Sequence, residues 1–280
     1  MSASSYLTDI QAWRRQYAEN LASPDGWLAV SGLFWLQEGE NLFGSDPSSQ
    51  ITLPEGSAPA QAGVFTLREG QVTLQCAKGV QMTLNDQPIT KTEIALSEYG
   101  SSEWIVLNDL KISVIQRGTR LGVRIFDKNN PSLKYFVYLR WFPVQEPYRI
   151  QARFVSHSEP VSIQTVNVLG DPLEMNCPGY AEFELQGETC RLSPIETDDG
   201  RLWFMFLDAT SGKETYSGGR YMTSTAPEEG LVTLDFNKAH NPPCAYTDFA
   251  TCPLPPPNNH LPVVIKAGEL QFRTPHIVHA

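Results

Sequence analysis

Hydrophobic residues recur with helical spacing near the start of the chain. They follow one another at steps of three and four residues, at Leu7, Ile10, Trp13, Tyr17 and Leu21. This spacing places them on one face of an α-helix, which Ser4 or Ser5 can cap. Pro24 and Gly26 predict the end of the helix, because proline restricts the residue before it and glycine tolerates the turn that follows. The pattern predicts an amphipathic helix over residues 1–22.

Beyond this helix, short segments rich in β-branched and aromatic residues alternate with turn residues, which is typical of antiparallel strands. In the first half of the chain the expected strands cover residues 64–67, 72–74, 82–84, 104–107 and 112–115. In the second half they cover residues 150–155, 161–168, 181–185, 202–207, 231–236 and 263–267. The sequence shows no repeat of 20–50 residues, so we expect a sandwich or barrel in each half.

The length of 280 residues favours two modules, because one hydrophobic core rarely fills a chain of this size. We therefore expect a mainly β protein in which the helix at 1–22 is followed by two packed antiparallel β modules. A sandwich is expected at residues 23–126 and a barrel-like domain at residues 127–280. The second module contains a proline-rich loop at residues 237–262.

Charge and cysteine content narrow the choice of partners and compartment. The chain carries 21 basic and 31 acidic residues, and its net charge of −10 is spread along the sequence. Nucleic acid is therefore not an expected partner, since its binding depends on clustered cations. No apolar run is long enough to span a membrane, and the first residues do not resemble a secretory signal. Five cysteines without tight spacing favour reduced thiols in the cytoplasm.

Three stretches of the first half, NLFGSDPSSQITLP, AGVFTLREGQVTL and TLNDQPI, resemble a forkhead-associated sandwich in their spacing. The residues at matching offsets are Gly44, Ile51, Leu53, Asn85 and Ile89. Ser45 stands where that family has arginine, Asp86 stands where it has glycine, and the Ser-x-x-His motif is missing. A phosphate reader needs an arginine fork or several converging donors. The resemblance therefore implies the fold without phosphothreonine binding.

Longer stretches resemble the prokaryotic family known as domain of unknown function 1684. They are GWLAVSGLFWLQEGENLFGSD, RWFPVQEPYRIQARF, DATSGKETYSGGRYM and LDFNKAHNPPCAYTDFATCPLPPPNNHLPVVIKAGE. Because the family carries no established activity, this resemblance implies membership and leaves the function open.

Residues 237–262 contain seven prolines and little strand character. A loop of this length in a compact domain is usually functional or disordered, and fixed proline torsions suit a preorganised binding rim. The alternative is a structural lid over sheet edges. Both interpretations remain open at this point.

Residue types that can carry chemistry lie in or next to this loop. An enzyme, possibly hydrolase-like and dependent on a thiol or metal, would use Asp235, His240 and Cys244. No metal or cofactor is expected, because structural zinc sites usually present a close Cys-x-x-Cys pair; Cys244 with Cys252 is the weaker alternative. Standard nucleophile-elbow, phosphate-loop and dinucleotide motifs are missing.

The preferred hypothesis is that the second module binds a small anionic or polar ligand. An arginine that follows two glycines can reach a carboxylate or phosphate, although it can equally pair with a nearby aspartate. The candidate ligand-binding residues are Arg149, Arg220, Tyr216, Tyr246 and Asn241. A protein-interaction scaffold is a third hypothesis, and the sequence leaves the oligomeric state open.

Overall fold

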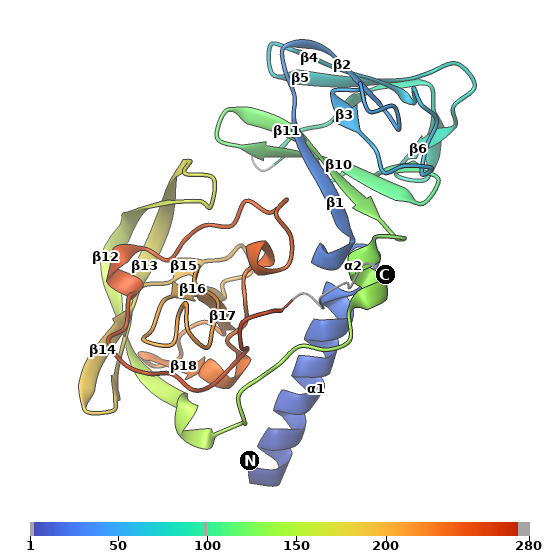
Figure 1. Ribbon diagram of the computed structural model, residues 1–280. Helices are drawn as coiled ribbons and strands as arrows, with labels where there is room; N and C mark the ends of the chain where they lie inside the picture. Colours follow the sequence, from blue (N-terminus) through green and yellow to red (C-terminus); the bar gives the residue numbers. More distant parts are fainter. Residues whose placement is uncertain (1–2, 98–99, 274–280) are drawn as a thin grey trace. The chain divides into compact units, whose positions relative to one another are not determined.

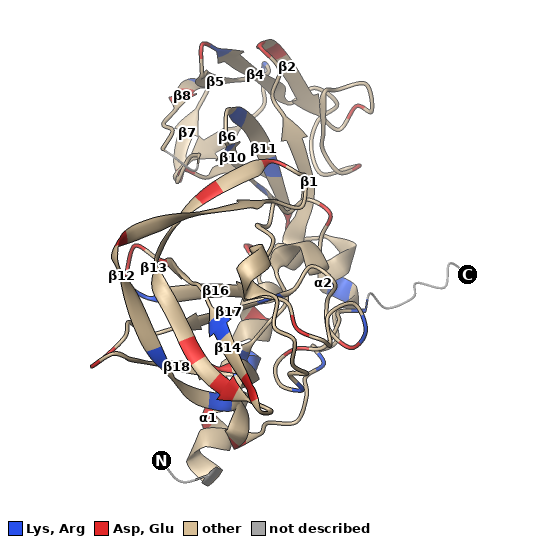
Figure 2. Ribbon diagram, turned by 90° about the vertical axis from the view of Figure 1, so that its left-hand side faces the viewer, with Lys and Arg blue, Asp and Glu red and all other residues tan. Residues whose placement is uncertain are grey.

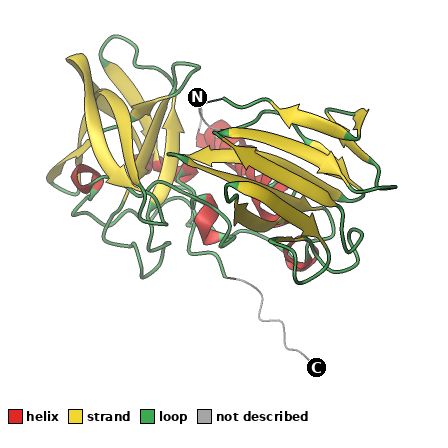
Figure 3. Ribbon diagram, turned by 90° about the horizontal axis from the view of Figure 1, so that it is seen from above, coloured by secondary structure: helices red, strands yellow, loops and turns green. Residues whose placement is uncertain are grey.

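The computed structural model describes residues 3–97 and 100–273. Strands dominate the described residues, helices are few, and the sheets are formed largely from antiparallel pairs (Figures 1 and 3). The prediction of a mainly β chain with an N-terminal helix is therefore confirmed. The chain divides into two compact units, Asn20–Phe136 and Met1–Glu19 with Val137–Ala280. We refer to these as the N-terminal unit and the C-terminal unit.

The N-terminal unit begins with η1 (Trp27–Ala29) and ends with α2 (Pro131–Tyr135). Its strands are β1 (Val30–Trp35), β2 (Gly39–Gly44), β3 (Ile51–Thr52), β4 (Gly63–Arg68), β5 (Gln71–Cys76), β6 (Met82–Leu84), β7 (Gln87–Ile89), β8 (Lys91–Ile94), β9 (Ile105–Leu107), β10 (Leu110–Arg117) and β11 (Arg120–Asp127). In the described part of this unit they form two sheets, in the orders β1-β11-β10-β9-β6-β7 and β3-β2-β4-β5-β8.

One hydrophobic core joins these two sheets. Phe43 and Phe65 are almost fully buried in it, with ring centroids 4.9 Å apart. The hairpin between β6 and β7 turns through Asn85 and Asp86, whose φ angles of 49° and 65° lie in the left-handed region. Asparagine and aspartate tolerate this conformation better than most residues. The glycine of the forkhead-associated pattern is therefore not required for the turn.

The C-terminal unit contains α1 (Ala3–Leu21) as far as Glu19, and the 3-10 helices η2 (Glu146–Tyr148), η3 (Phe236–Lys238), η4 (Pro243–Ala245) and η5 (Pro257–Asn259). Its strands are β12 (Arg149–Val166), β13 (Pro172–Leu185), β14 (Glu188–Leu192), β15 (Ile195–Glu196), β16 (Leu202–Phe206), β17 (Arg220–Ser224) and β18 (Leu231–Asp235). The described residues form two sheets, β14-β13-β12-β18 and β15-β16-β17.

The core of the C-terminal unit lies between these sheets. Phe206 packs edge-on against Phe236, with ring centroids 5.4 Å apart, and both side chains are fully buried. Acidic and basic residues both occur in β12 and β14, whereas the charged residues of β13 are all acidic (Figure 2). None of the helices in the described ranges combines the length and hydrophobicity needed to cross a lipid bilayer.

Helix α1 ends at Leu21, close to the predicted boundary. Gly26 follows the helix at a point where a Cβ atom would lie 2.3 Å from the carbonyl oxygens of Asn20 and Leu21. The chain therefore needs glycine there to pass close to the end of the helix.

The strand expected at residues 263–267 is absent, and this prediction is wrong. The alternation that suggested it is real, because Val263, Ile265 and Ala267 are buried. However, side chains bind the backbone of this segment: Asp208 accepts a hydrogen bond from the Ile265 N–H at 2.8 Å, and the Tyr148 hydroxyl accepts one from Lys266 at 3.2 Å. Backbone groups that side chains satisfy do not need a strand ladder.

Candidate functional site

The proline-rich segment, residues 237–262, is fixed to the sheets of the C-terminal unit. Its beginning pairs with β17, where the backbones of His240 and Tyr221 exchange two hydrogen bonds of 2.8 and 2.9 Å. Its middle pairs with β12 and the residues just after it, through Cys252 O to Val168 N and Leu254 N to Val166 O, both 2.9 Å. The segment is therefore ordered on both sides of Cys244.

Two thiols meet within this segment. Cys244 lies in η4 and is partly exposed, whereas Cys252 is only 5% exposed. The backbone N–H of Cys244 donates a hydrogen bond to Sγ of Cys252 at 3.2 Å. The fold thus brings together two cysteines that seven residues separate in the sequence.

The environment makes the two thiols unequal. The hydrogen bond from the Cys252 thiol is the main factor that lowers the pKa of Cys244, and it outweighs the opposing effect of burial. The same hydrogen bond, together with burial, raises the pKa of Cys252. A thiolate that accepts a hydrogen bond is stabilised relative to the thiol. The geometry therefore favours Cys244 as the nucleophile and keeps Cys252 protonated.

Two tyrosines surround the thiol pair. The hydroxyl of Tyr216 donates a hydrogen bond to the carbonyl of Cys244 at 3.2 Å and also helps lower the pKa of the Cys244 thiol. The hydroxyl of Tyr221 donates to the carbonyl of Pro253 at 2.6 Å and lies close to the thiol of Cys252. Burial is the largest cause of the raised pKa of both tyrosines, so both remain protonated donors near neutral pH.

A second polar cluster lies next to the thiol pair and is centred on Glu269, which is fully buried. The hydroxyl of Tyr246 lies 2.8 Å from Oε1 and 2.7 Å from Oε2 of Glu269, and the Asn241 N–H donates to Oε2 at 2.9 Å. Burial is the largest cause that raises the pKa of Glu269, to about 7. With a pKa near 7 the carboxyl group is partly protonated at neutral pH, and one oxygen can then donate to the Tyr246 hydroxyl while the other accepts from the Asn241 N–H.

Helix α1 reaches this cluster through Tyr17. The Tyr17 hydroxyl lies 3.2 Å from the Tyr246 hydroxyl and donates to the carbonyl of Asn241 at 3.2 Å. Asn241 precedes η4 and Tyr246 is its C-cap, so Tyr17 contacts both ends of the turn that carries Cys244.

The three residues expected in an enzyme have separate partners. Asp235 accepts a hydrogen bond from Tyr6 at 2.8 Å and caps η3 through the N–H of Asn237 at 3.1 Å. The ring of His240 packs against Tyr17, and burial lowers the pKa of His240 to about 4. Cys244 instead interacts with Cys252 and Tyr216, and both cysteines are free thiols. In the described structure these contacts do not join the three residues into a relay.

The two arginines expected to bind an anion are engaged in other contacts. The guanidinium of Arg220 is fully buried, pairs with Asp208 at 3.0 Å and donates to the carbonyls of Ala267 and Ile265. Arg149 is exposed, and its guanidinium carbon lies 5.2 Å from the ring centroid of Tyr6. Of the five expected ligand-binding residues, Tyr216, Tyr246 and Asn241 lie around η4.

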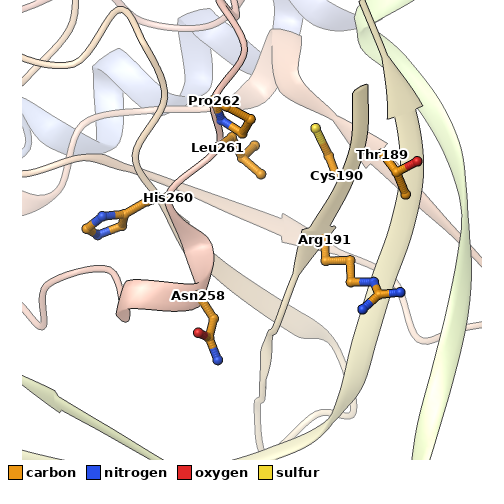
Figure 4. Close-up of a pocket in the computed structure, with 7 residues that line it drawn as sticks. All are labelled: Thr189, Cys190, Arg191, Asn258, His260, Leu261 and Pro262. Carbon is orange, nitrogen blue, oxygen red and sulfur yellow. The ribbon is translucent and has the colours of Figure 1, made fainter. Parts of the chain in front are cut away.

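A pocket of about 380 Å³ lies between β14 and the end of the proline-rich segment (Figure 4). It is lined by Thr189, Cys190, Arg191, Asn258, His260, Leu261 and Pro262. The Arg191 guanidinium pairs with Glu182 at 2.8 Å, and the imidazole of His260 points away from β14 in Figure 4. The polar groups of this pocket therefore do not converge on one point. Within residues 3–97 and 100–273, no three His, Cys, Asp or Glu side chains are arranged to hold a metal ion.

Glu269 and Tyr17 are functional residues that the sequence alone did not indicate. Glu269 lies beyond the proline-rich segment, and Tyr17 fits the apolar face of the first helix. A glutamate between Gly268 and Leu270, at the end of the largely apolar residues 261–268, was the one available signal of a buried carboxyl group.

Comparison with known proteins gives similarities without an activity. Residues 134–270 match a family described as "Protein of unknown function (DUF1684)". The chain is similar to an uncharacterised protein of Haloarcula marismortui solved by NMR, with 32% identity, 50% of this chain and 80% of that chain covered, and a TM-score of 0.42. No curated protein matches the chain.

Forkhead-associated domains are among the solved structures that match. The FHA domain of FhaA, solved with the intracellular domain of Rv3910, has 16% identity, covers 33% of this chain and 96% of that chain, and gives a TM-score of 0.24. The FHA-2 domain of the Mycobacterium tuberculosis ABC transporter Rv1747 has 17% identity, covers 32% of this chain and 77% of that chain, and also gives 0.24.

Proposed function

Because the chain belongs to the DUF1684 family, whose description names no activity, we propose a function from the site alone: Cys244 and Cys252 perform thiol–disulfide exchange. The observation that carries this proposal is the close approach of the two cysteines, in which Sγ of Cys252 accepts the backbone N–H of Cys244 at 3.2 Å. The substrate class is a low-molecular-weight disulfide.

The exchange proceeds in two displacements. The Cys244 thiolate attacks one sulfur of the substrate disulfide, whose S–S bond breaks and releases one thiolate that takes a proton from water. Cys252 then loses its proton to water and attacks the sulfur of Cys244, which breaks the mixed disulfide and releases the second thiol. The two protein thiols are oxidised to one disulfide, and the substrate disulfide is reduced to two thiols.

The difference in exposure supports this order of events. Cys244 is partly exposed and its pKa is lowered, so it can react with a molecule from solution. Cys252 is buried behind it and has a raised pKa, so it reacts after the first bond has formed. Tyr216 and Tyr221 hold the backbone next to the two sulfurs, through their hydrogen bonds to the carbonyls of Cys244 and Pro253.

Oxidised glutathione is a suitable probe, and peptide mass spectrometry is the readout. The reduced protein is expected to lose two hydrogens in a peptide pair linked through Cys244 and Cys252. The variant Cys252→Ser is expected to accumulate a glutathione adduct at Cys244, because the second displacement is blocked. The variant Cys244→Ser is expected to form neither product.

Cys190→Ser is the matched control, since Cys190 is also buried, at 2% exposure, and lies outside the pair. It tests whether a serine hydroxyl in a buried thiol position unfolds the unit. If the control variant behaves like the wild-type protein and glutathione labels Cys76 as fast as Cys244 in the wild-type protein, the proposed exchange is wrong.

A further inference from the structure

Helix α1 contacts other parts of the C-terminal unit that are far away in the sequence. The Tyr6 hydroxyl donates to Asp235 at 2.8 Å, and Arg14 donates to the carbonyls of Phe142 and Asn237, both at 3.1 Å. Near its other end, Tyr17 contacts the two residues that flank the Cys244 turn, Asn241 and Tyr246. The last contact differs from the others, because it depends on a hydroxyl chain that ends at a buried carboxyl group.

The series of hydrogen-bonded hydroxyl groups runs from Tyr17 to Tyr246 and from Tyr246 to Glu269. The oxygen–oxygen distances are 3.2 Å for the first step and 2.7–2.8 Å for the second. When Glu269 is protonated, it can donate to Tyr246 through one oxygen and accept from it or from Asn241 through the other. When Glu269 is ionised, it can only accept, so the Tyr246 hydroxyl must donate to it. The ionisation state of Glu269 therefore determines how the hydrogens of the Tyr246 and Tyr17 hydroxyl groups are oriented.

Among the residues that the structure describes, 3–97 and 100–273, none forms an ion pair with Glu269 at close range. The groups facing it are the hydroxyl of Tyr246, the amide of Asn241 and, through the chain, the hydroxyl of Tyr17. Arg220 attracts it from a greater distance, but the guanidinium is bound to Asp208 and to two carbonyls. Burial of an ionised carboxylate without an adjacent cation is costly.

We propose that protonation of Glu269 locks helix α1 onto the turn that carries Cys244, and that ionisation of Glu269 releases this contact. The lock acts on the end of α1 that carries Tyr17, while Tyr6 and Arg14 hold the rest of the helix. Its effect on thiol reactivity rests on the function proposed above, whereas the coupling between Glu269 and α1 does not depend on the thiols.

Linkage gives the size of the effect. If Glu269 titrates near 7 when the contact is closed and near the ordinary glutamate value of 4.5 when opening exposes it to water, the open population rises by at most about ten-fold between pH 6 and pH 8. The variant Glu269→Gln imitates the protonated form, because its amide can donate to Tyr246 while its carbonyl accepts. This variant is expected to stay closed at both pH values.

Hydrogen–deuterium exchange on the full chain tests the coupling directly. The ratio of wild-type to Glu269→Gln exchange rates at amides 14–19 of α1 is expected to grow from pH 6 to pH 8, by up to about ten-fold. Amides of β10 and β11 in the N-terminal unit serve as the internal standard. Glu214→Gln is the control for loss of an exposed carboxylate, since Glu214 is 44% exposed beside Lys266.

An unchanged ratio across this pH range would overturn the lock. If Glu269→Gln does not fold, the wild-type protein still decides the matter, because protection of amides 14–19 relative to β10 and β11 must fall between pH 6 and pH 8. The rate at which iodoacetamide labels Cys244 is measured in the same samples. If the exchange of amides 14–19 depends on Glu269 while the labelling rate of Cys244 does not change, Glu269 controls the contact with α1. Its control of the thiol site is then rejected.

Discussion

Two buried groups of the C-terminal unit should give its stability an unusual dependence on pH. Burial raises the pKa of Glu269 from 4.5 to about 7 and lowers the pKa of His240 from 6.5 to about 4. Glu269 binds its proton more tightly in the folded state, so its contribution is complete below pH 4.5 and is lost as the pH rises through 7. His240 is neutral in the folded state, so its contribution is complete above pH 6.5 and is lost as the pH falls toward 4.

Each shift of roughly 2.5 pH units corresponds to about 3 kcal/mol, and each group alone changes the free energy of unfolding by about 1.4 kcal/mol per pH unit. Between pH 4.5 and pH 6.5 the two slopes have opposite signs and cancel. The wild-type unit should therefore have a flat stability profile in this range and lose stability from pH 6.5 to above 7.

The variant Glu269→Gln removes one of the two slopes. Its free energy of unfolding should rise with pH by about 1.4 kcal/mol per unit between pH 4.5 and pH 6.5, because the His240 contribution remains. At pH 8 the variant should exceed the wild-type protein by as much as about 3 kcal/mol, provided that glutamine keeps the hydrogen bonds to Tyr246 and Asn241.

Urea unfolding at half-unit pH steps from 4.5 to 8, followed by the signal of the C-terminal unit, measures these profiles. His240→Phe should show the opposite slope, and Glu214→Gln should follow the wild-type curve. Carboxylates whose pKa is lowered by hydrogen bonds, such as Asp199 and Glu182, affect stability only at more acidic pH. Parallel profiles for the wild-type protein and Glu269→Gln would refute the reasoning.

Three further variants test other parts of the structure. Arg220→Met should destabilise the C-terminal unit by about 3–5 kcal/mol in urea unfolding, because it leaves Asp208 buried without its partner; the double variant with Asp208→Asn should recover part of this loss. Phe43→Ala should cost the N-terminal unit about 3–5 kcal/mol, since the ring is 1% exposed, and an effect below 1 kcal/mol would contradict the assigned core. Tyr216→Phe should raise the pKa of Cys244 and slow its labelling at neutral pH, measured by iodoacetamide and peptide mass spectrometry, and an equal rate would show that the hydroxyl does not stabilise the thiolate.

The sequence predicts much of the fold because periodicity reports burial. The steps of three and four residues that include Ile10 predict α1, in which Ile10 is fully buried. The segment at residues 263–267 shows the limit of this reasoning. Its alternation matches that of a strand, but the Asp208 carboxylate and the Tyr148 hydroxyl occupy its backbone N–H groups. Contacts of this kind join residues far apart in sequence and leave no local pattern.

The site was less accessible to sequence analysis than the fold. Cys244 and Cys252 could be singled out as chemically capable residues, but their contact depends on how the proline-rich segment pairs with β12 and β17. Glu269 and Tyr17 come from opposite ends of the chain and meet only in the folded unit. An arginine after two glycines suggested an anion site at Arg220, yet burial and Asp208 give it the structural partner that was the alternative interpretation.

The pH dependence of thiol labelling tests the central claim most directly, because two cysteines of the same molecule are expected to respond in opposite ways. Labelling of Cys244 by iodoacetamide should have its midpoint below the ordinary thiol value of 9.0, owing to the hydrogen bond from Cys252. Labelling of Cys76, whose pKa is raised by burial, should have its midpoint above that value. Coincident midpoints, or a midpoint for Cys244 above that of Cys76, would contradict the assignment of Cys244 as the activated thiol.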